Sequence, residues 1–368
     1  MVKLGIAGIG AIAENYIALI ADGRVEGVEL TALCSRNGEH ARQTASKYHL
    51  PVAVFTDYSA FLESGVVDAV LIATPHGQHP SMTRQALERG LHVLVEKPVG
   101  IFADEVEGIL AVLNQHRELV CGVQYNRRAA RAFRYVRELV HGGRIGELVR
   151  ATWVITNLYR PAAYYEKGSW RGTWQGEGGG ILMTQASHQL DLMQWICGVP
   201  STVWARCSTV GREIQVENEA ELLFTYTNGA RGHFIASAHE CPGTNLLEIC
   251  GTRGKVSVLD DSEVRVFCLE EDEREFARTC TNPFEKVPGM AWKRVFHDSD
   301  NGVQQAATIR NFARAVAGEE SVWCSLEEGI HSLRIIHGAY LSAWKRSEVP
   351  LPVDEGEFRG WMEGLGTR

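Results

Sequence analysis

The sequence lacks the features that mark membrane, disulfide-linked, metal-ribbon and nucleic-acid-binding proteins. No apolar run approaches the roughly 20 residues that a membrane-spanning helix needs, and the N-terminus has no signal peptide. The nine cysteines form no C-x-x-C pair, so neither a zinc ribbon nor a redox dithiol is indicated. The net charge is only -8 and the basic residues are scattered, which argues against a nucleic-acid partner. We therefore expect a cytoplasmic protein with reduced cysteines.

The chain is long enough for two hydrophobic cores, since its 368 residues exceed what one core usually serves. Strand and helix patterns alternate in the first third, which is typical of βαβ units. The expected strands are 2–8, 28–35, 67–75, 91–98 and 119–125, and the expected helices are 13–23, 39–49, 81–90 and 103–115. These segments contain five strands, and the prediction for residues 1–122 as a whole is a doubly wound parallel sheet of six strands.

The remaining residues, 123–368, show a different pattern. A helix at 129–141, a strand at 147–156 and a long helix after Gly180 come first. Alternating segments follow at 201–210, 219–228, 230–239, 245–260 and 262–271. They predict an α+β domain with a large, mostly antiparallel, open-faced sheet, which binds substrate and pairs subunits into a homodimer or homotetramer. We expect 269–302 to be rich in loops, and the helices at 303–318 and 325–344 to pack on the domains, including back on the first.

A glycine-rich loop joins the first predicted strand to the first helix. It reads Gly8-Ile9-Gly10-Ala11-Ile12-Ala13, which is G-x-G-x-x-A. Gly8 permits the tight turn, Gly10 admits a pyrophosphate to the helix N-terminus, and Ala13 allows close helix packing. A plain glycine turn is the alternative, but strand, spacing and helix are all present. The loop predicts a Rossmann dinucleotide-binding domain that contacts the cofactor through Gly8, Gly10, Ala11, Ile12 and Ala13.

The tip of the second strand bears on the choice between NAD and NADP. An acidic residue there would bind the ribose 2′-hydroxyl of NAD, but the chain has Ser35 and Arg36 instead. Because a guanidinium group suits a 2′-phosphate, NADP is slightly favoured. NAD, including a tightly bound NAD, remains the alternative.

Polar side chains follow several predicted strands at the carboxyl edge of the sheet, where open α/β sheets bind ligands. The strand at 91–98 ends in Glu96-Lys97-Pro98, so a lysine lies where the strand enters this crevice. The other residues that we expect at the cofactor or the substrate there are Thr74, Pro75, His76, His79, Gln124 and Arg127.

These motifs together resemble the Gfo/Idh/MocA oxidoreductase family. They are GxGxxA, Ala73-Thr74-Pro75 with His79, Glu96-Lys97-Pro98, and GGGILMTQASHQLDLMQW at 178–195. The resemblance implies hydride transfer between a sugar or cyclic-polyol carbon and C4 of nicotinamide. It also implies that Glu96 contacts the nicotinamide ribose, and that Lys97 and His188 lie close to the reacting hydroxyl.

Oxidation of an alcohol requires a base for the hydroxyl proton, and a neutral histidine beside a cation is suitable. The hypothesis is that His188 is this base and Lys97 its electrostatic partner. Relatives that resemble inositol dehydrogenases have an Asp four residues before the histidine, where this chain has Thr184. Without that carboxylate His188 lacks one orienting partner, so the alternative is that Lys97 is the base and that Thr184 or Gln185 bonds substrate hydroxyls.

Asp191 lies three residues beyond His188, near it on a helix surface, where it would orient the ring or bind a hydroxyl; a structural role is the alternative. His188 and Asp191 supply two metal ligands without a clear third, so no metal site is predicted. An aromatic and basic stretch precedes the glycines, and its Tyr165 and Trp174 suit stacking on a sugar, whereas packing is the alternative. The predicted substrate-binding residues are Lys97, Arg127, Tyr165, Trp174, Thr184, Gln185, His188 and Asp191.

Within the family the chain looks most similar to members that act on glucosides or free sugars, which implies oxidation at C3 of a glucoside. Three other functions stay open. An NADPH-dependent reductase of keto or anhydro sugars would use the same residues, and a glycosidase would recycle a bound NAD. A sensor of sugars or dinucleotides would be expected to lack Lys97 or His188, and both are present.

Overall fold

A computed structural model describes residues 1–166, 168, 170–297 and 303–365. By contacts between residues, the chain divides into two compact units. Unit 1 comprises residues 1–129 and 301–333, and unit 2 comprises 130–300 and 334–368. The division of the chain into domains 1–122 and 123–368 stays a prediction.

The sheet of unit 1 is parallel and confirms the predicted Rossmann architecture. Its strands within the described residues are β1 (Val2–Ala7), β2 (Val28–Cys34), β3 (Ala53–Phe55), β4 (Ala69–Ile72), β5 (His92–Val95) and β6 (Cys121–Val123). Their order is β3-β2-β1-β4-β5-β6, and every pair is parallel. The sequence pattern did not name β3, because three residues are too few to show a period. The order reverses between β1 and β4, which is the position where such sheets open a ligand crevice.

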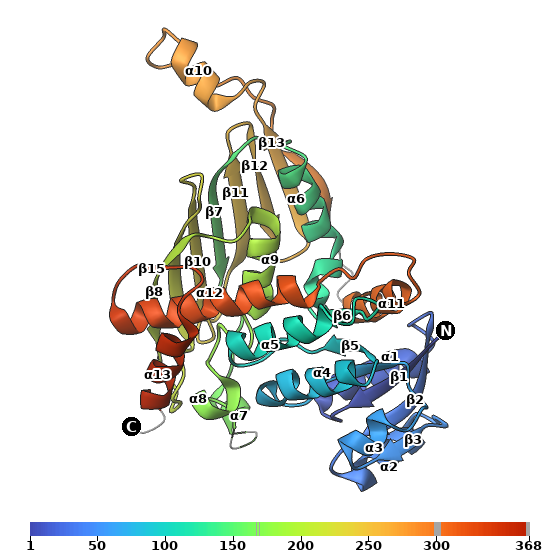
Figure 1. Cartoon of the computed structure of the whole chain (residues 1–368). Helices are drawn as coiled ribbons and strands as arrows, with labels where there is room; N and C mark the ends of the chain where they lie inside the picture. The colour runs from blue at the N-terminus through green and yellow to red at the C-terminus, as the bar shows by residue number, and fades with distance from the viewer. Residues whose placement is uncertain (167, 169, 298–302, 366–368) are drawn as a thin grey trace. The chain divides into compact units, whose positions relative to one another are not determined.

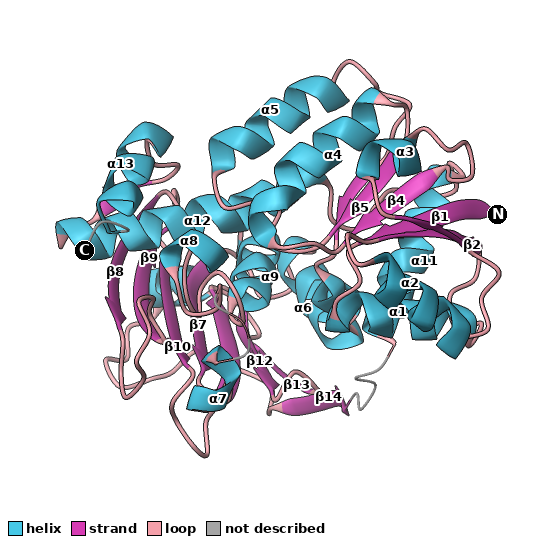
Figure 2. Ribbon diagram, turned by 90° about the horizontal axis from the view of Figure 1, so that it is seen from below, coloured by secondary structure: helices cyan, strands magenta, loops and turns pink. Residues whose placement is uncertain are grey.

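Helices cover both faces of this sheet (Figure 2). They are α1 (Ala11–Ala21), α2 (Gly38–Lys47), α3 (Tyr58–Leu62), α4 (His79–Glu88), α5 (Ala103–Leu113) and α11 (Gln304–Val316), with short 3-10 turns at His76–Gln78 and Asn126–Ala129. Helices α4 and α5 lie on one face, and α1, α2 and α11 lie on the other. Both faces are therefore buried, as expected for a parallel sheet of apolar strands.

Helix α11 comes from the far end of the chain but belongs to the core of unit 1. Its apolar residues recur at helical spacing, and Ile309 and Phe312 are fully buried. They pack in one cluster with Ile17 of α1 and Leu4 of β1. The segment 303–318, expected to pack on the domains, thus completes the hydrophobic core of the Rossmann unit.

Unit 2 contains a sheet that is antiparallel except where β7 meets β10, which confirms the predicted class. Its strands are β7 (Leu148–Ile155), β8 (Thr202–Ser208), β9 (Glu219–Thr225), β10 (Arg231–Ser237), β11 (Asn245–Gly251), β12 (Gly254–Leu259), β13 (Glu263–Cys268), β14 (Lys293–His297) and β15 (Val349–Pro350). In the described part of the chain their order is β14-β13-β12-β11-β7-β10-β9-β8-β15. The alternating segments of the sequence account for β8 to β13.

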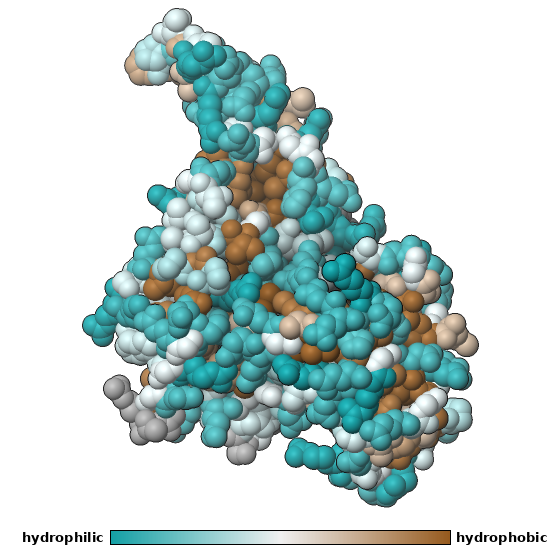
Figure 3. All heavy atoms as spheres, in the orientation of Figure 1, coloured by the Kyte–Doolittle hydropathy of each residue, from teal (hydrophilic) through white to brown (hydrophobic). Residues whose placement is uncertain are grey.

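The helices of unit 2 are α6 (Arg131–His141), α7 (Ala162–Tyr165), α8 (Trp174–Glu177), α9 (Ser187–Cys197), α10 (Glu273–Thr279) and α13 (Glu355–Leu365), together with residues 334–345 of α12 (Leu326–Lys345). Helices α6 and α9 lie over the same face of the sheet (Figure 1). Hydrophobic residues show beside α6 on this side of the molecule (Figure 3). Among the described residues, none of the helices is long and apolar enough to cross a membrane.

One expectation for unit 2 needs correction and another needs detail. The described part of 269–302 is rich in loops, as predicted, but it also contains α10 and β14. Asp272 caps α10 by accepting a hydrogen bond from the Arg274 backbone at 3.0 Å. Such a cap is a sequence signal for the start of a helix, but it is hard to recognise in a segment that is polar throughout. The helix after Gly180 begins only at Ser187, since turns occupy 181–186.

The sheet face opposite α6 and α9 presents apolar side chains in register. Ile235, Val154, Leu246 and Leu259 stand side by side on β10, β7, β11 and β12. On the neighbouring row, Leu223 pairs with Trp204 and His233 and is 44% exposed. An apolar row of this kind is the expected form of an open-faced sheet that another surface covers.

Removal of the Phe312 side chain should destabilise unit 1. Phe312→Ala would leave a cavity in the core, and we expect a loss of about 3–5 kcal/mol in the free energy of unfolding. The measurement is chemical denaturation, with Arg314→Ala on the exposed side of the same helix as the control. Equal stabilities of the two variants would contradict the place of α11 in this core.

Candidate active site

The glycine loop follows β1 at the crevice beside β4. Gly8 has φ of 91°, and a Cβ there would approach the Ala73 carbonyl to 2.8 Å. Its N–H donates to the Cys34 carbonyl at 2.9 Å. Residue 8 therefore needs glycine both for its conformation and for the close approach of β4.

The loop also fits a pyrophosphate. Gly10 is exposed, and a Cβ there would meet no atom within 4 Å, so the space in front of this backbone is open. Among the described side chains, none caps the N-terminus of α1, where backbone N–H groups and the helix dipole favour an anion. Ala11 and Ile12 are exposed beside it, whereas Ala13 is buried under the helix.

The end of β2 directs one cationic side chain outward. The Ser35 hydroxyl accepts a hydrogen bond from the Asn37 backbone at 3.3 Å, and Asn37 caps α2 by accepting from His40. Arg36, between them, is exposed. Since the polar atoms of Ser35 and Asn37 serve the turn, Arg36 is the residue of this tip best able to bind a phosphate.

His79 connects the ends of β4 and β5. It is fully buried, and its Nδ1 and Nε2 lie 2.7 Å from the carbonyls of Pro98 and Thr74, respectively. Burial lowers the pKa of this imidazole more than its backbone partners raise it. Both nitrogens face protein carbonyls, so His79 shapes the edge that carries Thr74, Pro75 and His76. Its expected contact with the cofactor stays a prediction.

Glu96 and Lys97 emerge at the end of β5 beside a tyrosine of α1. The Tyr16 hydroxyl donates a hydrogen bond to the buried Glu96 carboxyl group, and the Lys97 backbone N–H donates to its other oxygen at 3.1 Å. Burial raises the pKa of Glu96, while Tyr16 and the Lys97 charge oppose this rise. Burial, and then the Glu96 charge, raise the pKa of Tyr16 well above its ordinary value. A hydrogen bond with the buried Gln124 opposes this rise.

Unit 1 thus brings most of its predicted residues to one edge. The ends of β1, β2, β4, β5 and β6 carry, in order, the glycine loop, Ser35 with Arg36, the segment from Thr74 to His76, Glu96 with Lys97, and Gln124, which Arg127 follows in the turn Asn126–Ala129. Tyr16 is the participant that sequence reasoning missed, because a tyrosine inside an amphipathic helix carries no distinguishing pattern.

The other candidate residues lie in unit 2: Tyr165 and Trp174 precede the three glycines at 178–180, and Thr184, Gln185, His188 and Asp191 follow them. The Thr184 hydroxyl lies 2.7 Å from the Gly180 carbonyl and 2.6 Å from the Gln185 side-chain oxygen. Gln185 in turn donates to the Tyr164 hydroxyl at 3.0 Å. Thr184 and Gln185 therefore form one hydrogen-bonded group with α7.

His188 and Asp191 lie on α9. His188 is in the first turn and is half-buried. Asp191 is fully buried and accepts a hydrogen bond from Gln194 at 3.1 Å. This bond within the helix favours the structural reading of Asp191 that the sequence left open. No group of three or more metal-ligating side chains occurs among the residues that the structure describes.

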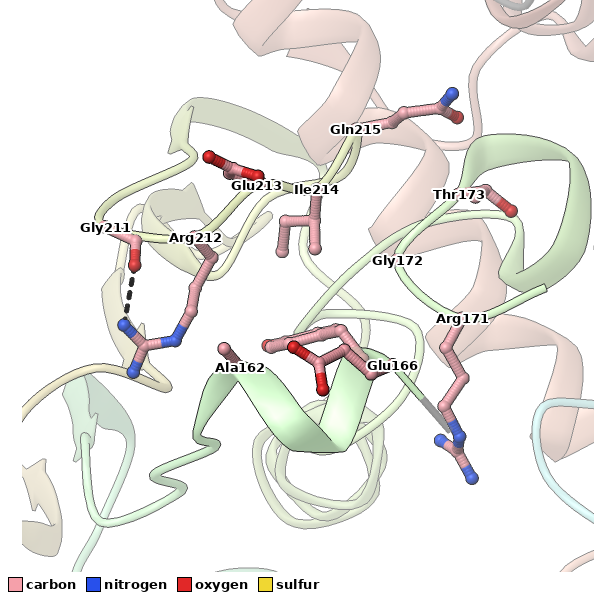
Figure 4. A pocket seen from close by; sticks show the side chains of 11 residues that line it. Ala162, Glu166, Arg171, Gly172, Thr173, Gly211, Arg212, Glu213, Ile214 and Gln215 are labelled. Carbon is pink, nitrogen blue, oxygen red and sulfur yellow. Dashed lines mark hydrogen bonds between the residues drawn. The ribbon is translucent and has the colours of Figure 1, made fainter. Parts of the chain in front are cut away.

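A pocket of about 930 Å³ separates α7 from the loop 211–215 (Figure 4). Tyr165, Glu166 and Ile214 line it, with Arg171 and Arg212 at its sides. Tyr165 therefore faces a space large enough for a sugar ring. Burial is the main cause that raises the pKa of its hydroxyl.

Trp174 has several packing contacts. The centroid of its ring lies 5.1 Å from that of Tyr340 and 5.5 Å from that of Trp344, both edge-on, and its N–H donates to the Gln215 carbonyl at 3.1 Å. These contacts favour the packing alternative, and stacking of Trp174 on a sugar stays a prediction. Aromatic composition alone could not distinguish the pocket residue Tyr165 from this core residue.

The fold and the dinucleotide loop define an oxidoreductase with an NAD-binding Rossmann fold. Residues 2–125 match the model described as "Oxidoreductase family, NAD-binding Rossmann fold", and residues 133–257 match the "GFO/IDH/MocA C-terminal domain". The chain belongs to the Gfo/Idh/MocA oxidoreductase family.

The similar proteins have low sequence identity to this chain, but the similarity covers nearly the whole length of both proteins. The chain is 24% identical to an uncharacterized oxidoreductase, YrbE, of Bacillus subtilis (strain 168), over 92% of this chain and 93% of that protein. It is 26% identical to a 1,5-anhydro-D-fructose reductase of Ensifer adhaerens, over 90% and 95%. A solved levoglucosan dehydrogenase, in complex with NADH and levoglucosan, matches with a TM-score of 0.79 and 22% identity, over 96% and 100%.

Removal of the Arg36 side chain should affect NADPH more than NADH. If its guanidinium group binds the 2′-phosphate, Arg36→Ala should weaken NADPH binding about tenfold or more and leave NADH nearly unchanged. Fluorescence titration with each cofactor measures this, with Arg42→Ala on α2 as the control. An equal loss for both cofactors, or none, would contradict the assignment.

Proposed function

We propose that the protein transfers hydride between a secondary hydroxyl or ketone of a sugar, glycoside or cyclic polyol and C4 of a bound nicotinamide. The observation that carries the proposal is Lys97, at the end of a buried parallel strand on the same edge as the glycine loop. A lysine there places a cation beside the crevice, where it would stabilise a developing alkoxide. NADP(H) is slightly favoured over NAD(H) because Arg36 stands at the tip of β2.

The nicotinamide would supply the hydride acceptor or donor, and the protein residues would handle the proton. In this proposal His188 accepts the hydroxyl proton and Lys97 stabilises the oxygen from which it leaves. Because Thr184 replaces the carboxylate of some relatives, Lys97 is the alternative base. The residues that would bind the cofactor are Gly8, Gly10, Ala11, Ile12, Arg36, Glu96 and Gln124, with Ser35, Ala13, Thr74 to His76 and His79 shaping their surroundings.

The substrate class follows from the polar groups around Thr184 and from the relatives. Levoglucosan and 1,5-anhydro-D-fructose, which those relatives' names give, are both cyclic and rich in hydroxyl groups. Thr184, Gln185 and Arg127 would bond such hydroxyls. The Tyr165 pocket would accept the second group of a glycoside, which supports oxidation of a glucoside, with C3 as the proposed carbon.

The anhydrofructose reductase among the relatives supports the opposite direction as a second candidate, an NADPH-dependent reductase of keto or anhydro sugars. The same residues serve both directions, because an acid that donates a proton one way is the base of the reverse reaction. Glycoside cleavage with a recycled NAD, and sugar sensing without turnover, are further outcomes that the substrate experiment distinguishes.

We also propose that the open face of the unit 2 sheet pairs subunits into a homodimer or homotetramer. The row from Ile235 to Leu259 and the exposed Leu223 supply an apolar surface across several strands. A second copy of the same face would cover it, as is common for symmetric oligomers.

The function is tested with a panel of sugars, inositols and glucosides, supplied with NAD and NADP or with the reduced cofactors. We expect one substrate class to be oxidised or reduced with an equal change in nicotinamide, detected by absorbance and product mass. Lys97→Ala should lower kcat/KM at least about a hundredfold yet retain cofactor affinity, because the loop and α1 still bind the pyrophosphate.

Lys47→Ala, at an exposed lysine paired with Glu14, is the matched control and should retain wild-type turnover. Near-normal turnover of Lys97→Ala would remove Lys97 from the chemistry. Glycoside cleavage without a net change in nicotinamide would support the recycling glycosidase, and binding without turnover would support the sensor.

A charge on the open face should disrupt the oligomer. Leu223→Arg would bury a guanidinium group at the proposed interface, so we expect a shift toward the monomer in size-exclusion chromatography with light scattering. Val199→Arg, at an exposed apolar residue between α9 and β8, is the control and should retain the wild-type mass. A monomeric wild type would overturn the proposed pairing.

A further inference from the structure

Glu217, just before β9, is a buried carboxylate without a role in the proposed chemistry. It is 4% exposed, and its two oxygens bind the backbone of the segment after the glycines. Gly180 N–H donates to one oxygen at 2.9 Å and Leu182 N–H to the other at 3.0 Å. The intervening Ile181 N–H donates to the Glu217 backbone carbonyl at 3.0 Å. One residue thus binds three successive N–H groups.

Tyr340 of α12 completes this arrangement. Its hydroxyl donates to Glu217 at 2.8 Å and accepts from the Gly180 N–H at 3.2 Å. The ring is fully buried and packs against Trp174 and Trp344. Tyr340 therefore donates to the same carboxylate oxygen as the Leu182 backbone and also bonds the Gly180 backbone.

The glycines before the segment are explained by this contact. A Cβ at Gly180 would lie 1.8 Å from the Glu217 carbonyl oxygen, and one at Gly179 would lie 2.1 Å from the Tyr340 hydroxyl. These positions lack side chains because the Glu217 backbone carbonyl and the Tyr340 phenol occupy the space beside the backbone. The two glycines therefore allow close packing of the backbone and do not form a flexible linker.

The anchored backbone leads directly to the predicted substrate residues. Thr184 N–H donates to the Gly180 carbonyl at 3.0 Å, and the Thr184 hydroxyl approaches the same carbonyl. Gln185 follows and bonds Tyr164, and α9 with His188 begins two residues later. A shift of Gly180 would therefore move the group that would bind substrate hydroxyls.

We propose that Glu217, held by Tyr340, is a positioning residue that sets Thr184 and Gln185 for binding substrate hydroxyls. This inference rests on the proposed function for the substrate, but the anchor itself is a property of unit 2. Glu217 would touch neither substrate nor cofactor; it would act through the Gly180 to Leu182 backbone.

The test is hydrogen exchange by mass spectrometry on wild type, Glu217→Gln and Tyr340→Phe, with melting curves to show that each variant folds. Glutamine has one acceptor oxygen and turns an NH₂ group toward a backbone donor, so we expect amides 180–182 to exchange about tenfold faster or more. Tyr340→Phe, which keeps the carboxylate, should show a smaller increase. Glu177→Gln is the matched control, because Glu177 is equally buried but accepts from Gly172 at 2.6 Å.

A pH series provides a readout that loss of packing alone would not produce. Burial raises the pKa of Glu217 to about 7, even though its backbone and Tyr340 donors oppose the rise. The titratable groups that face it, Tyr340 and Cys207, have pKa values raised well above their ordinary range, so both stay neutral near pH 7. Because the closed segment raises this pKa, ionisation of Glu217 opposes closure. Wild-type protection of amides 180–182 should therefore be highest below pH 4.5 and fall as the pH rises to about 7, whereas Glu217→Gln should show low protection without this pH dependence.

The kinetic readout uses whichever panel sugar the wild type turns over. Glu217→Gln should raise KM for this sugar about tenfold with a smaller change in kcat, and the dissociation constant for NADPH should not change. Unchanged exchange at 180–182, or faster exchange without a change in KM, would overturn the inference. If the wild type turns over no sugar, the proposed function fails, and the exchange and pH data decide the anchor alone.

Discussion

Each unit depends on a buried carboxylate that has to find hydrogen-bond donors inside the protein. A charged oxygen removed from water is costly unless donors compensate it, so the surrounding backbone is held wherever those donors lie. In unit 1 the carboxylate is Glu96, bonded by Tyr16 and the Lys97 backbone. In unit 2 it is Glu217, bonded by Gly180, Leu182 and Tyr340.

Both carboxylates fix a segment that carries candidate chemistry. Glu96 precedes Lys97 at the crevice, and His79 adds a second constraint by connecting the carbonyls of Thr74 and Pro98. Glu217 fixes the turn before Thr184 and Gln185. The candidate side chains thus project from backbone that buried polar groups hold in place, which suits a site that has to orient a cofactor and a hydroxyl.

Much of this arrangement could be predicted from the sequence. Apolar strands, helix patterns and glycine spacing predicted the parallel sheet and the loop at Gly8, because these features depend on local periodicity and steric limits. The partners of buried groups could not be predicted in this way. Tyr16 and Tyr340 look like ordinary helix residues, and the sequence around Trp174 does not show that its ring packs against Tyr340. Such contacts join residues far apart in the chain and leave no local pattern.

The most direct test of the proposed function is a crystal structure of the protein grown with NADPH. We expect the pyrophosphate to lie at Gly10 and the N-terminus of α1, with the 2′-phosphate at Arg36 and the nicotinamide beside Glu96 and Lys97. A dinucleotide bound away from the glycine loop, or a nicotinamide directed away from Lys97, would contradict the central claim that this edge of the sheet carries the chemistry.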